Sequence, residues 1–546
     1  MTGTHQQVSL KRTWPRVILC VFAAGLVCGA AAMPAAGWAA GSMQTAALPV
    51  NPPIDPKLVQ SLPTLLGDAD AARYAAIFSL QDEANWKAAD QHIAALEDKS
   101  LLGTVLAQRY LSAKYHTNFA EARDWLEHYA DLPEARAIWA LAKKRAPGKP
   151  VPAPILAADQ APRDAAPRVA RSADVERLPA EPRSMNIQPP ARFEAGLAAW
   201  REKNFRDAAN AFEAVSRATD VPSWYVAAGA FWAARAHLML REPQKVDPLL
   251  EMAAQQPRTF YGLLARRMLG VEPDMRFGAT PLSAGETAQL EGLPGGRRAL
   301  ALVQVGETDR AEAELRALTQ RSAPGLADAI VALADLANMP ALCLALSTGR
   351  RGAGDRHDDA AYPVPRWQPR DGFSVDRALL FALMMQESRF DADAQSGSGA
   401  AGLMQLMPQT ARDVARRAGI RFRSVDDLVD PVLNLSIGQE YVKQLIEHTQ
   451  INGNLILLLA AYNSGTAPLT RWQNKPEYQH DPLLFIESLT TTSQRLYVER
   501  VLTNMWIYRQ RLGQKVPDLD ALAANEWPTY VSADASSQGV QHAAAR

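Results

Sequence analysis

The residue best suited to chemistry is Glu387, which stands in an apolar helical pattern. Leu383 and Met384 lie four and three residues before it, so the three side chains share one face of a helix. Burial disfavours the charged form of a carboxyl group and raises its pKa. A carboxyl that stays protonated near neutral pH can act as a general acid toward a leaving-group oxygen. The alternative is an ionised Glu387 at the helix edge, paired with Arg377 or Arg389.

The helix that carries Glu387 is expected to begin at Ser374, because serine commonly caps helices, and to have Asp376 in its first turn. A turn-rich run at residues 391–401 follows it, and a second amphipathic helix ends at Gly419. The pattern predicts a carboxyl group at the end of one helix, beside a loop that leads into the next.

The loop contains a literal G-x-G-x-x-G at Gly397, Gly399 and Gly402. A dinucleotide site needs a strand before these glycines and a βαβ unit after them. Here a helix precedes them and no β-branched run follows, so we interpret the match as accidental. The glycines instead indicate a loop whose backbone closely approaches another part of the chain or a ligand.

Three motifs resemble the signatures of the soluble lytic transglycosylases, whose catalytic domain is similar to goose-type lysozyme. They are Glu387-Ser388, then Gly402-Leu-Met-Gln-Leu-Met-Pro408, then Ala460-Ala-Tyr-Asn-Ser-Gly465. Asn434, Gly438 and Tyr441 also fit the family pattern. The resemblance implies an all-α fold: a helical solenoid or superhelix followed by a lysozyme-like α-helical catalytic domain.

The resemblance also implies roles for individual residues. Glu387 would be the catalytic residue, and the substrate-binding residues would be Ser388, Met404, Gln405, Tyr462, Asn463 and Tyr497. Tyr497 could hydrogen-bond near Glu387 and orient it. Ordinary structural roles compete: Ser388 could bond its own helix backbone, Met404 could fill the core, and Asn463 could satisfy a turn.

The activity implied by the resemblance is that of a lyase. Lytic transglycosylases cleave the bond between N-acetylmuramic acid and N-acetylglucosamine in peptidoglycan and leave a 1,6-anhydro end, with one acid acting first as acid and then as base. Glycoside hydrolysis normally needs two carboxylates. Among Asp391, Asp393 and Glu487, none is a convincing second one. The alternatives are a hydrolytic muramidase and a non-catalytic scaffold that binds peptidoglycan.

The last family signature shows a departure. At residues 486–498 the chain has Thr490 where the family has Pro, and Ser493 where the family has a second Glu that helps to organise the cleft. Arg495 and Tyr497 are retained. The departure keeps the scaffold alternative open.

The rest of the chain divides by composition. We predict a signal peptide at 1–40, an N-terminal helical region at 41–146, a Pro- and Ala-rich linker at 147–190, a superhelix at 191–350, a catalytic domain at 351–515 and a disordered tail at 516–546. Helices are expected at Ala71–Gln81, Asp82–Leu96, Leu101–Ala113, Asn118–Tyr129 and Leu132–Lys144. The superhelix could be a protein-binding repeat module or, by the resemblance, a cradle for glycan strands.

Charge and cysteine content limit the partners and the compartment. The 58 basic and 58 acidic residues balance, so no net field favours nucleic acid. Signal cleavage would leave no integral membrane segment and only Cys343, since Cys20 and Cys28 lie in the leader. The resemblance implies export to the periplasm and peptidoglycan glycan strands as the partner; further cell-wall or secretion complexes are not specified. Neither a metal site nor a cofactor is expected, because the histidines are scattered.

Overall fold

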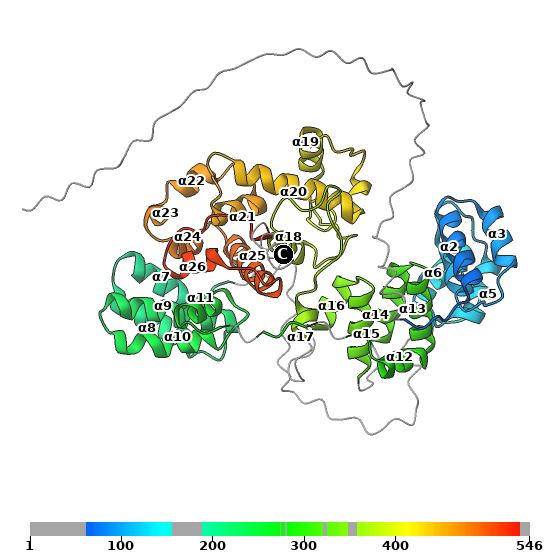
Figure 1. Cartoon of the computed structure of the whole chain (residues 1–546), viewed down its shortest axis with the longest axis horizontal. Coiled ribbons are helices and arrows are strands. Elements are labelled where there is room, and N and C mark those ends of the chain that lie inside the picture. The colour runs from blue at the N-terminus through cyan, green and yellow to red at the C-terminus, as the bar shows by residue number, and fades with distance from the viewer. Residues whose placement is uncertain are drawn as a thin grey trace, which may run out of the picture. The chain divides into compact units, whose positions relative to one another are not determined.

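The computed structural model describes residues 62–155, 188–272, 275–278, 281–319, 325–347 and 357–534, and within these ranges the chain is all-α (Figure 1). Its described residues contain isolated β-bridges but no strand. The predicted fold class is confirmed. The signal peptide predicted at 1–40 and most of the linker predicted at 147–190 lie outside the described residues, and none of the described helices is long and apolar enough to cross a membrane.

The N-terminal helices are α2 (Asp68–Asp82), α3 (Trp86–Ala94), α4 (Leu102–Leu111), α5 (Phe119–Tyr129) and α6 (Ala135–Arg145). The predicted helices are present, with several boundaries moved by one to four residues. The largest change is in α3, which begins at Trp86 rather than Asp82. The Asn85 side chain caps it, and Ala84 adopts a left-handed φ of 60° that ends the preceding helix.

A second group comprises α7 (Ala191–Arg201), α8 (Phe205–Ser216), α9 (Ser223–Met239), η2 (Pro243–Lys245), α10 (Val246–Ala254) and α11 (Phe260–Met268). Small residues allow α8 and α9 to approach closely. A Cβ on Gly229 would lie 2.9 Å from the Phe212 carbonyl oxygen. Trp200 and Trp232 meet edge to face at 5.1 Å in the core of this group.

A third group comprises α12 (Ala284–Glu291), α13 (Pro294–Gln304), α14 (Thr308–Leu318), α15 (Leu326–Leu336), α16 (Pro340–Ser347) and α17 (His357–Ala361). It contacts the N-terminal helices. The Gln304 side chain accepts hydrogen bonds from the backbone N–H groups of Leu65 and Leu66, and Arg298 joins Glu314 to Asp131.

The C-terminal group comprises α18 (Arg377–Glu387), α19 (Pro408–Ala418), η3 (Val425–Val429), α20 (Pro431–Glu447), α21 (Leu455–Ser464), α22 (Leu469–Gln473), α23 (Pro476–His480), α24 (Pro482–Glu487), α25 (Thr492–Arg511) and α26 (Pro517–Ala523). The central helix is α18, whose residues 378–384 are all buried. It lies beside α25 (Figure 1). The predicted start at Ser374 is wrong: Asp376 caps the helix by accepting from the Ala378 N–H.

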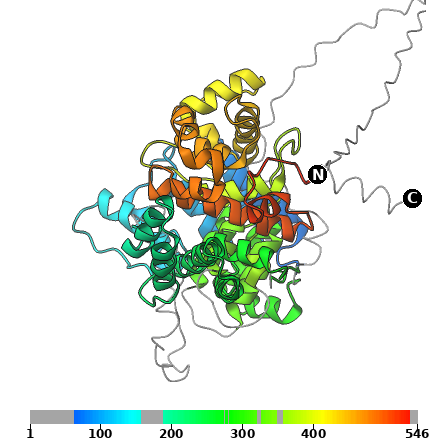
Figure 2. The same cartoon turned by 90° about the vertical axis from the view of Figure 1, so that its left-hand side faces the viewer.

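The buried apolar residues form separate cores. Residues 193–265 share one core with residues 344–522, and the stacked rings of Phe260 and Trp506, 5.3 Å apart, lie in it. In the ribbon, green helices of the first segment lie beside red helices of the second (Figure 2). Residues 290–343 share another core with residues 62–105. The domain borders predicted at 190, 350 and 515 stay predictions.

The disordered tail predicted at 516–546 is wrong for residues 516–534. They form α26, with Leu519 and Leu522 buried, and an extended segment in which Trp527 packs 4.8 Å from the Tyr478 ring. The prediction failed because it weighed composition alone, whereas the apolar residues of this segment find partners far away in the sequence. Residues 535–546 lie outside the described part.

Candidate active site

Glu387 is the last residue of α18, where the helix gives way to an unusual turn. Arg389 and Phe390 follow with left-handed φ values of 55° and 65°. Such backbone is strained for residues other than glycine and occurs often at functional sites. The turn points the chain away from α18 immediately after the carboxyl group.

The Tyr497 hydroxyl, from α25, donates a hydrogen bond to Glu387 Oε1 at 2.6 Å. Burial raises the pKa of Glu387 to about 7, and the hydrogen bond from Tyr497 partly opposes this rise by favouring the carboxylate. The hydrogen bond that the sequence suggested is present, whereas no ion pair with Arg377 or Arg389 is found for Glu387 among the described residues. The arrangement gives a carboxyl group that can hold or release a proton near neutral pH.

A second tyrosine, Tyr462, lies near this carboxyl group. The Tyr462 hydroxyl donates to the Met404 carbonyl oxygen at 2.9 Å, and the rings of Tyr441 and Tyr462 lie 5.3 Å apart. Burial, followed by the nearby Glu387 carboxylate, raises the pKa of both Tyr462 and Tyr497 well above the ordinary value. These phenols therefore remain neutral hydrogen-bond donors.

Met404 and Gln405 lie in the loop before α19. Met404 is fully buried, and a Cβ on Gly438 would lie 2.2 Å from its sulfur. Gln405 has a left-handed φ of 45°, and its Nε2 donates to the carbonyl oxygens of Ala394 and Gly402. Within the described residues nothing donates to its Oε1 atom, which is left free to accept a hydrogen bond.

The glycine-rich loop owes its shape to one of its glycines. Gly402 has a φ of 75°, and a Cβ there would lie 2.1 Å from both Asn434 Nδ2 and the Leu428 carbonyl oxygen. The buried Asn434 side chain also accepts from the Met404 N–H and donates to the Ala401 carbonyl. The expected close backbone approach is confirmed at Gly402, whereas Gly397 and Gly399 have open space around them.

Ser388 and Asn463 differ in exposure. Ser388 is fully buried, and its hydroxyl donates to the Met384 carbonyl oxygen, which is the structural role weighed against substrate contact. Asn463 is exposed at the end of α21, and the Ser464 hydroxyl donates to its Oδ1. Gln494 Nε2 in turn donates to Ser464 Oγ at 2.8 Å.

Gln494 lies near Asn463, a proximity that the sequence did not reveal. It follows Ser493, which is exposed in the first turn of α25 and lies where the family pattern has Glu. A signal was available, because Thr491 and Gln494 have the spacing of a capping box, which fixes Gln494 at the start of the helix.

The other acidic candidates are engaged elsewhere. Glu487 is buried, accepts a hydrogen bond of 2.5 Å from the Tyr261 hydroxyl and pairs with Arg495 at 3.3 Å. Asp391 accepts from the Asp393 N–H in the turn after α18, and Asp393 is exposed. The described residues include no group of His, Cys, Asp or Glu suited to hold a metal ion.

Comparison with solved structures identifies the fold. The chain is similar to the 70 kDa soluble lytic transglycosylase SLT70 from Escherichia coli, with a TM-score of 0.57 and 17% identity over 85% of this chain and 100% of that one. It is also similar to the 70 kDa soluble lytic transglycosylase in complex with bulgecin A, with a TM-score of 0.51 and 19% identity over 85% and 74% of the two chains. The fold is thus that of an all-α protein with a superhelix and a lysozyme-like domain.

Sequence comparison shows which family and which proteins the chain resembles. Residues 368–484 match the transglycosylase SLT domain family. The soluble lytic murein transglycosylase of Escherichia coli strain K12 is 33% identical over 157 residues, which are 29% of this chain and 24% of that protein. Membrane-bound lytic murein transglycosylase C of Histophilus somni strain 2336 is 32% identical over 143 residues, 24% of this chain and 37% of that protein. The family resemblance is confirmed, and the chain spans about a quarter of its first curated relatives' length.

Proposed function

We propose that the protein is a peptidoglycan lytic transglycosylase in which Glu387 is the catalytic acid and base. The observation that carries the proposal is the half-buried Glu387 carboxyl group, which lies near Tyr462, accepts a hydrogen bond from Tyr497 and has its pKa raised to about 7. The match of residues 368–484 to the SLT domain family supports the substrate class. The names of its relatives refer to murein, and we propose murein as the substrate of this protein as well.

The first step is protonation. Glu387 in its neutral form donates its proton to the glycosidic oxygen between N-acetylmuramic acid and N-acetylglucosamine, and the bond from that oxygen to the muramic acid C1 breaks. The N-acetyl group of the substrate stabilises the positive charge that develops at C1. The engagement of Glu487 with Tyr261 and Arg495 supports a mechanism that needs no second carboxylate.

The second step closes a ring. Glu387, now a carboxylate, takes the proton of the C6 hydroxyl of the same sugar, and the C6 oxygen bonds to C1. An intramolecular nucleophile of this kind can reach an effective molarity on the order of 10⁵ M, well above that of water. The acid is restored and the product carries a 1,6-anhydro end.

Side chains around Glu387 are assigned to substrate binding. The free Oε1 of Gln405 and the exposed Asn463 would accept and donate hydrogen bonds to the sugars, and Tyr462 would line the cleft. The buried Met404 would shape the cleft. Ser388, whose hydroxyl is bonded to Met384, would support the turn that holds Glu387.

Mass analysis of digested peptidoglycan tests the function. Purified protein is incubated with sacculi and the masses of the released muropeptides are measured. The expected products are lighter by one water than those of a muramidase. Products of hydrolytic mass would establish a muramidase instead. Binding to sacculi without any released product would establish a scaffold. Because the proposed substrate is murein, we also propose a periplasmic location, which fractionation of cells would test.

A further inference from the structure

We propose that residues 527–534 form a positioning strap that holds the two helices bearing the active-site side chains. The strap contacts the N-terminus of α18, which ends in Glu387, and the N-terminus of α21, which ends beside Tyr462 and Asn463. This inference rests on the proposed function, since it assigns positioning residues to the same site.

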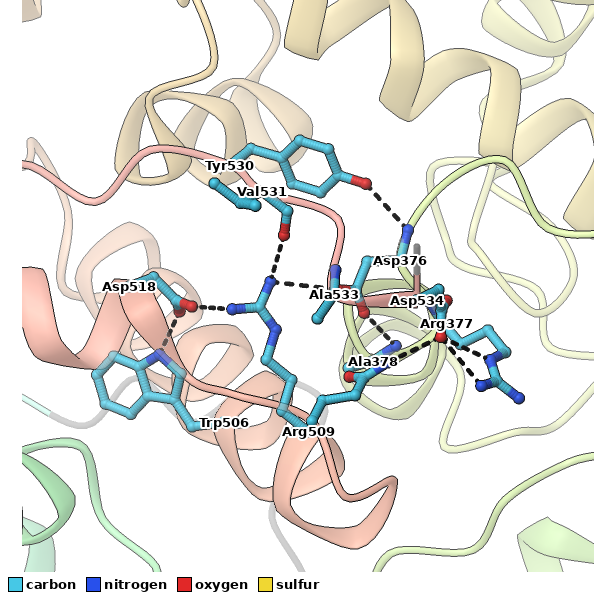
Figure 3. A network of polar contacts seen from close by, with 11 residues as sticks. Asp376, Arg377, Ala378, Trp506, Arg509, Asp518, Tyr530, Val531, Ala533 and Asp534 are labelled. Atoms are coloured by element: carbon cyan, nitrogen blue, oxygen red, sulfur yellow. Dashed lines mark hydrogen bonds and ion pairs between the residues drawn. The ribbon is translucent and has the colours of Figure 1, made fainter. Parts of the chain in front are cut away.

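The strap satisfies the first backbone groups of α18 (Figure 3). The Tyr530 hydroxyl accepts from the Asp376 N–H at 3.0 Å, and Asp534 accepts from the Arg377 N–H at 2.8 Å. The Asp534 carboxylate also pairs with the Arg377 guanidinium at 3.0 Å, and the Ala533 N–H donates to Asp376 Oδ2 at 2.8 Å. The first N–H groups of a helix have no partner within the helix, so these bonds fix where α18 begins.

The same strap pairs with the start of α21. The Leu455 N–H donates to the Pro528 carbonyl oxygen at 2.9 Å, and the Tyr530 N–H donates to the Gly453 carbonyl oxygen at 2.7 Å. Asn454 and Thr529 form an antiparallel bridge between these two bonds. Tyr530 therefore contacts one helix through its side chain and the other through its backbone.

Buried contacts hold the strap itself in place. Arg509 of α25 is fully buried, donates to the Val531 carbonyl oxygen at 2.9 Å and forms ion pairs with Asp376 and Asp518 (Figure 3). A buried ion pair is costly to break and specifies one arrangement of its partners. The strap is thus anchored to α25, the helix that also supplies Tyr497.

These contacts set where the far ends of α18 and α21 lie. A helix is close to rigid over its 11 or 10 residues, so a shift at its first turn is passed to its last. A displacement of about 1 Å at a reacting group can reduce the rate by as much as about 100-fold. Tyr530 and Asp534 are therefore positioning residues for Glu387 and Tyr462, which they do not touch.

The test compares Tyr530→Phe and Asp534→Asn with a matched control in the full-length chain. Tyr530→Phe removes the hydroxyl that accepts from the Asp376 N–H and also hydrogen-bonds the Ser532 side chain, and Asp534→Asn removes the ion pair with Arg377. The control is Glu526→Gln, which removes an exposed carboxylate just before the strap. Anhydro-muropeptide release gives kcat and KM at several pH values, and hydrogen–deuterium exchange follows the peptides that cover α18 and α21.

We expect kcat to fall by about 10- to 100-fold in both strap variants while KM changes by less than about twofold, because positioning acts on the reacting geometry. The alkaline limb of the pH profile should move to lower pH as Glu387 becomes more solvated. Exchange should accelerate in α18, whose first-turn contacts both variants weaken, and the control should match the wild type.

Two results would overturn the strap. One is a lower melting temperature with wild-type kcat and pH profile, and the other is faster exchange in the strap without faster exchange in α18. If the wild type itself releases no anhydro product, the proposed function fails, and the exchange measurement alone decides whether the strap holds α18.

Discussion

The Tyr497 hydroxyl and the Glu387 carboxyl lie 2.6 Å apart although 110 positions separate the two residues in the chain. One hydrogen bond thus joins the end of α18 to the first half of α25. It also gives the acid a neutral donor instead of a cation. A guanidinium or ammonium in that place would hold the carboxyl ionised and unable to protonate an oxygen.

Replacing Glu387 by Gln should remove cleavage and keep the fold. The amide is close in shape and can still accept a hydrogen bond from Tyr497, but it has no proton to donate as an acid. General acid catalysis contributes about 10²- to 10⁴-fold, so the rate should fall at least that far. Muropeptide release measures the rate and circular dichroism checks the fold. Activity close to wild type would mean that another group is the acid.

The pH dependence should follow the pKa of about 7 for Glu387. The first step needs the protonated form, so kcat/KM should fall as the pH rises through about 7. Because the folded pKa is raised above the unfolded one, the stability linked to this group is present at pH 4 and is lost as the pH rises through 7.

The same linkage predicts a change in stability for Glu387→Gln. The variant should be more stable than the wild type at pH 8, by about 1–3 kcal/mol relative to the difference at pH 4. Urea unfolding at the two pH values measures it. An unchanged difference would show that Glu387 is not buried in the folded protein.

Tyr497→Phe should shift the alkaline limb of the pH profile upward. The lost hydrogen bond favours the carboxylate, so without it the pKa of Glu387 rises further, by about one unit for a bond of about 1.5 kcal/mol. The rate at the optimum should fall about 10-fold, because the acid loses its orienting partner. A downward shift of the limb would contradict this account and would indicate that water had entered beside Glu387.

Gly438→Ala should destabilise the protein by about 1–3 kcal/mol through overpacking. The new methyl would lie 2.2 Å from the Met404 sulfur in the core. Combining it with Met404→Ala should recover part of the loss, since the smaller side chain makes room. Gly285→Ala, at an exposed position of α12 with nothing within 4 Å of the new atom, is the matched control and should not destabilise the protein. If the losses of stability of Gly438→Ala and Met404→Ala were additive in the double variant, residues 438 and 404 would not be in contact.

Arg495→Leu should cost about 3–5 kcal/mol, because it leaves the buried Glu487 without its cation. Adding Glu487→Gln should return part of this stability. The exposed Arg471 of α22 gives the control, since Arg471→Leu should change stability by less than about 0.5 kcal/mol. Denaturant unfolding measures all three. A mild effect of Arg495→Leu alone would indicate that Glu487 is already neutral in the wild type.

The site could be predicted from the sequence as far as local patterns reach. The apolar face around Glu387 indicated a buried acid, and the family motifs led to Tyr497. The cap at Asp376 could not be separated from one at Ser374, because both residue types cap helices and the choice depends on Arg509, which lies 133 positions away. The segment around Tyr530 was missed for the same reason: polar and small residues dominate it locally, and its partners are remote.

The shared core of residues 193–265 and 344–522 determines how the chain should respond to heat. The ring of Phe260 is stacked on that of Trp506, so the helices of residues 193–265 should melt together with those of residues 344–522. Residues 290–343, although they lie between these two segments in the sequence, belong to the other core and should melt in a separate event. Cys343 is buried in the core of residues 290–343. The reactivity of its thiol should therefore rise when that core melts and should not change when the core of residues 193–265 and 344–522 melts.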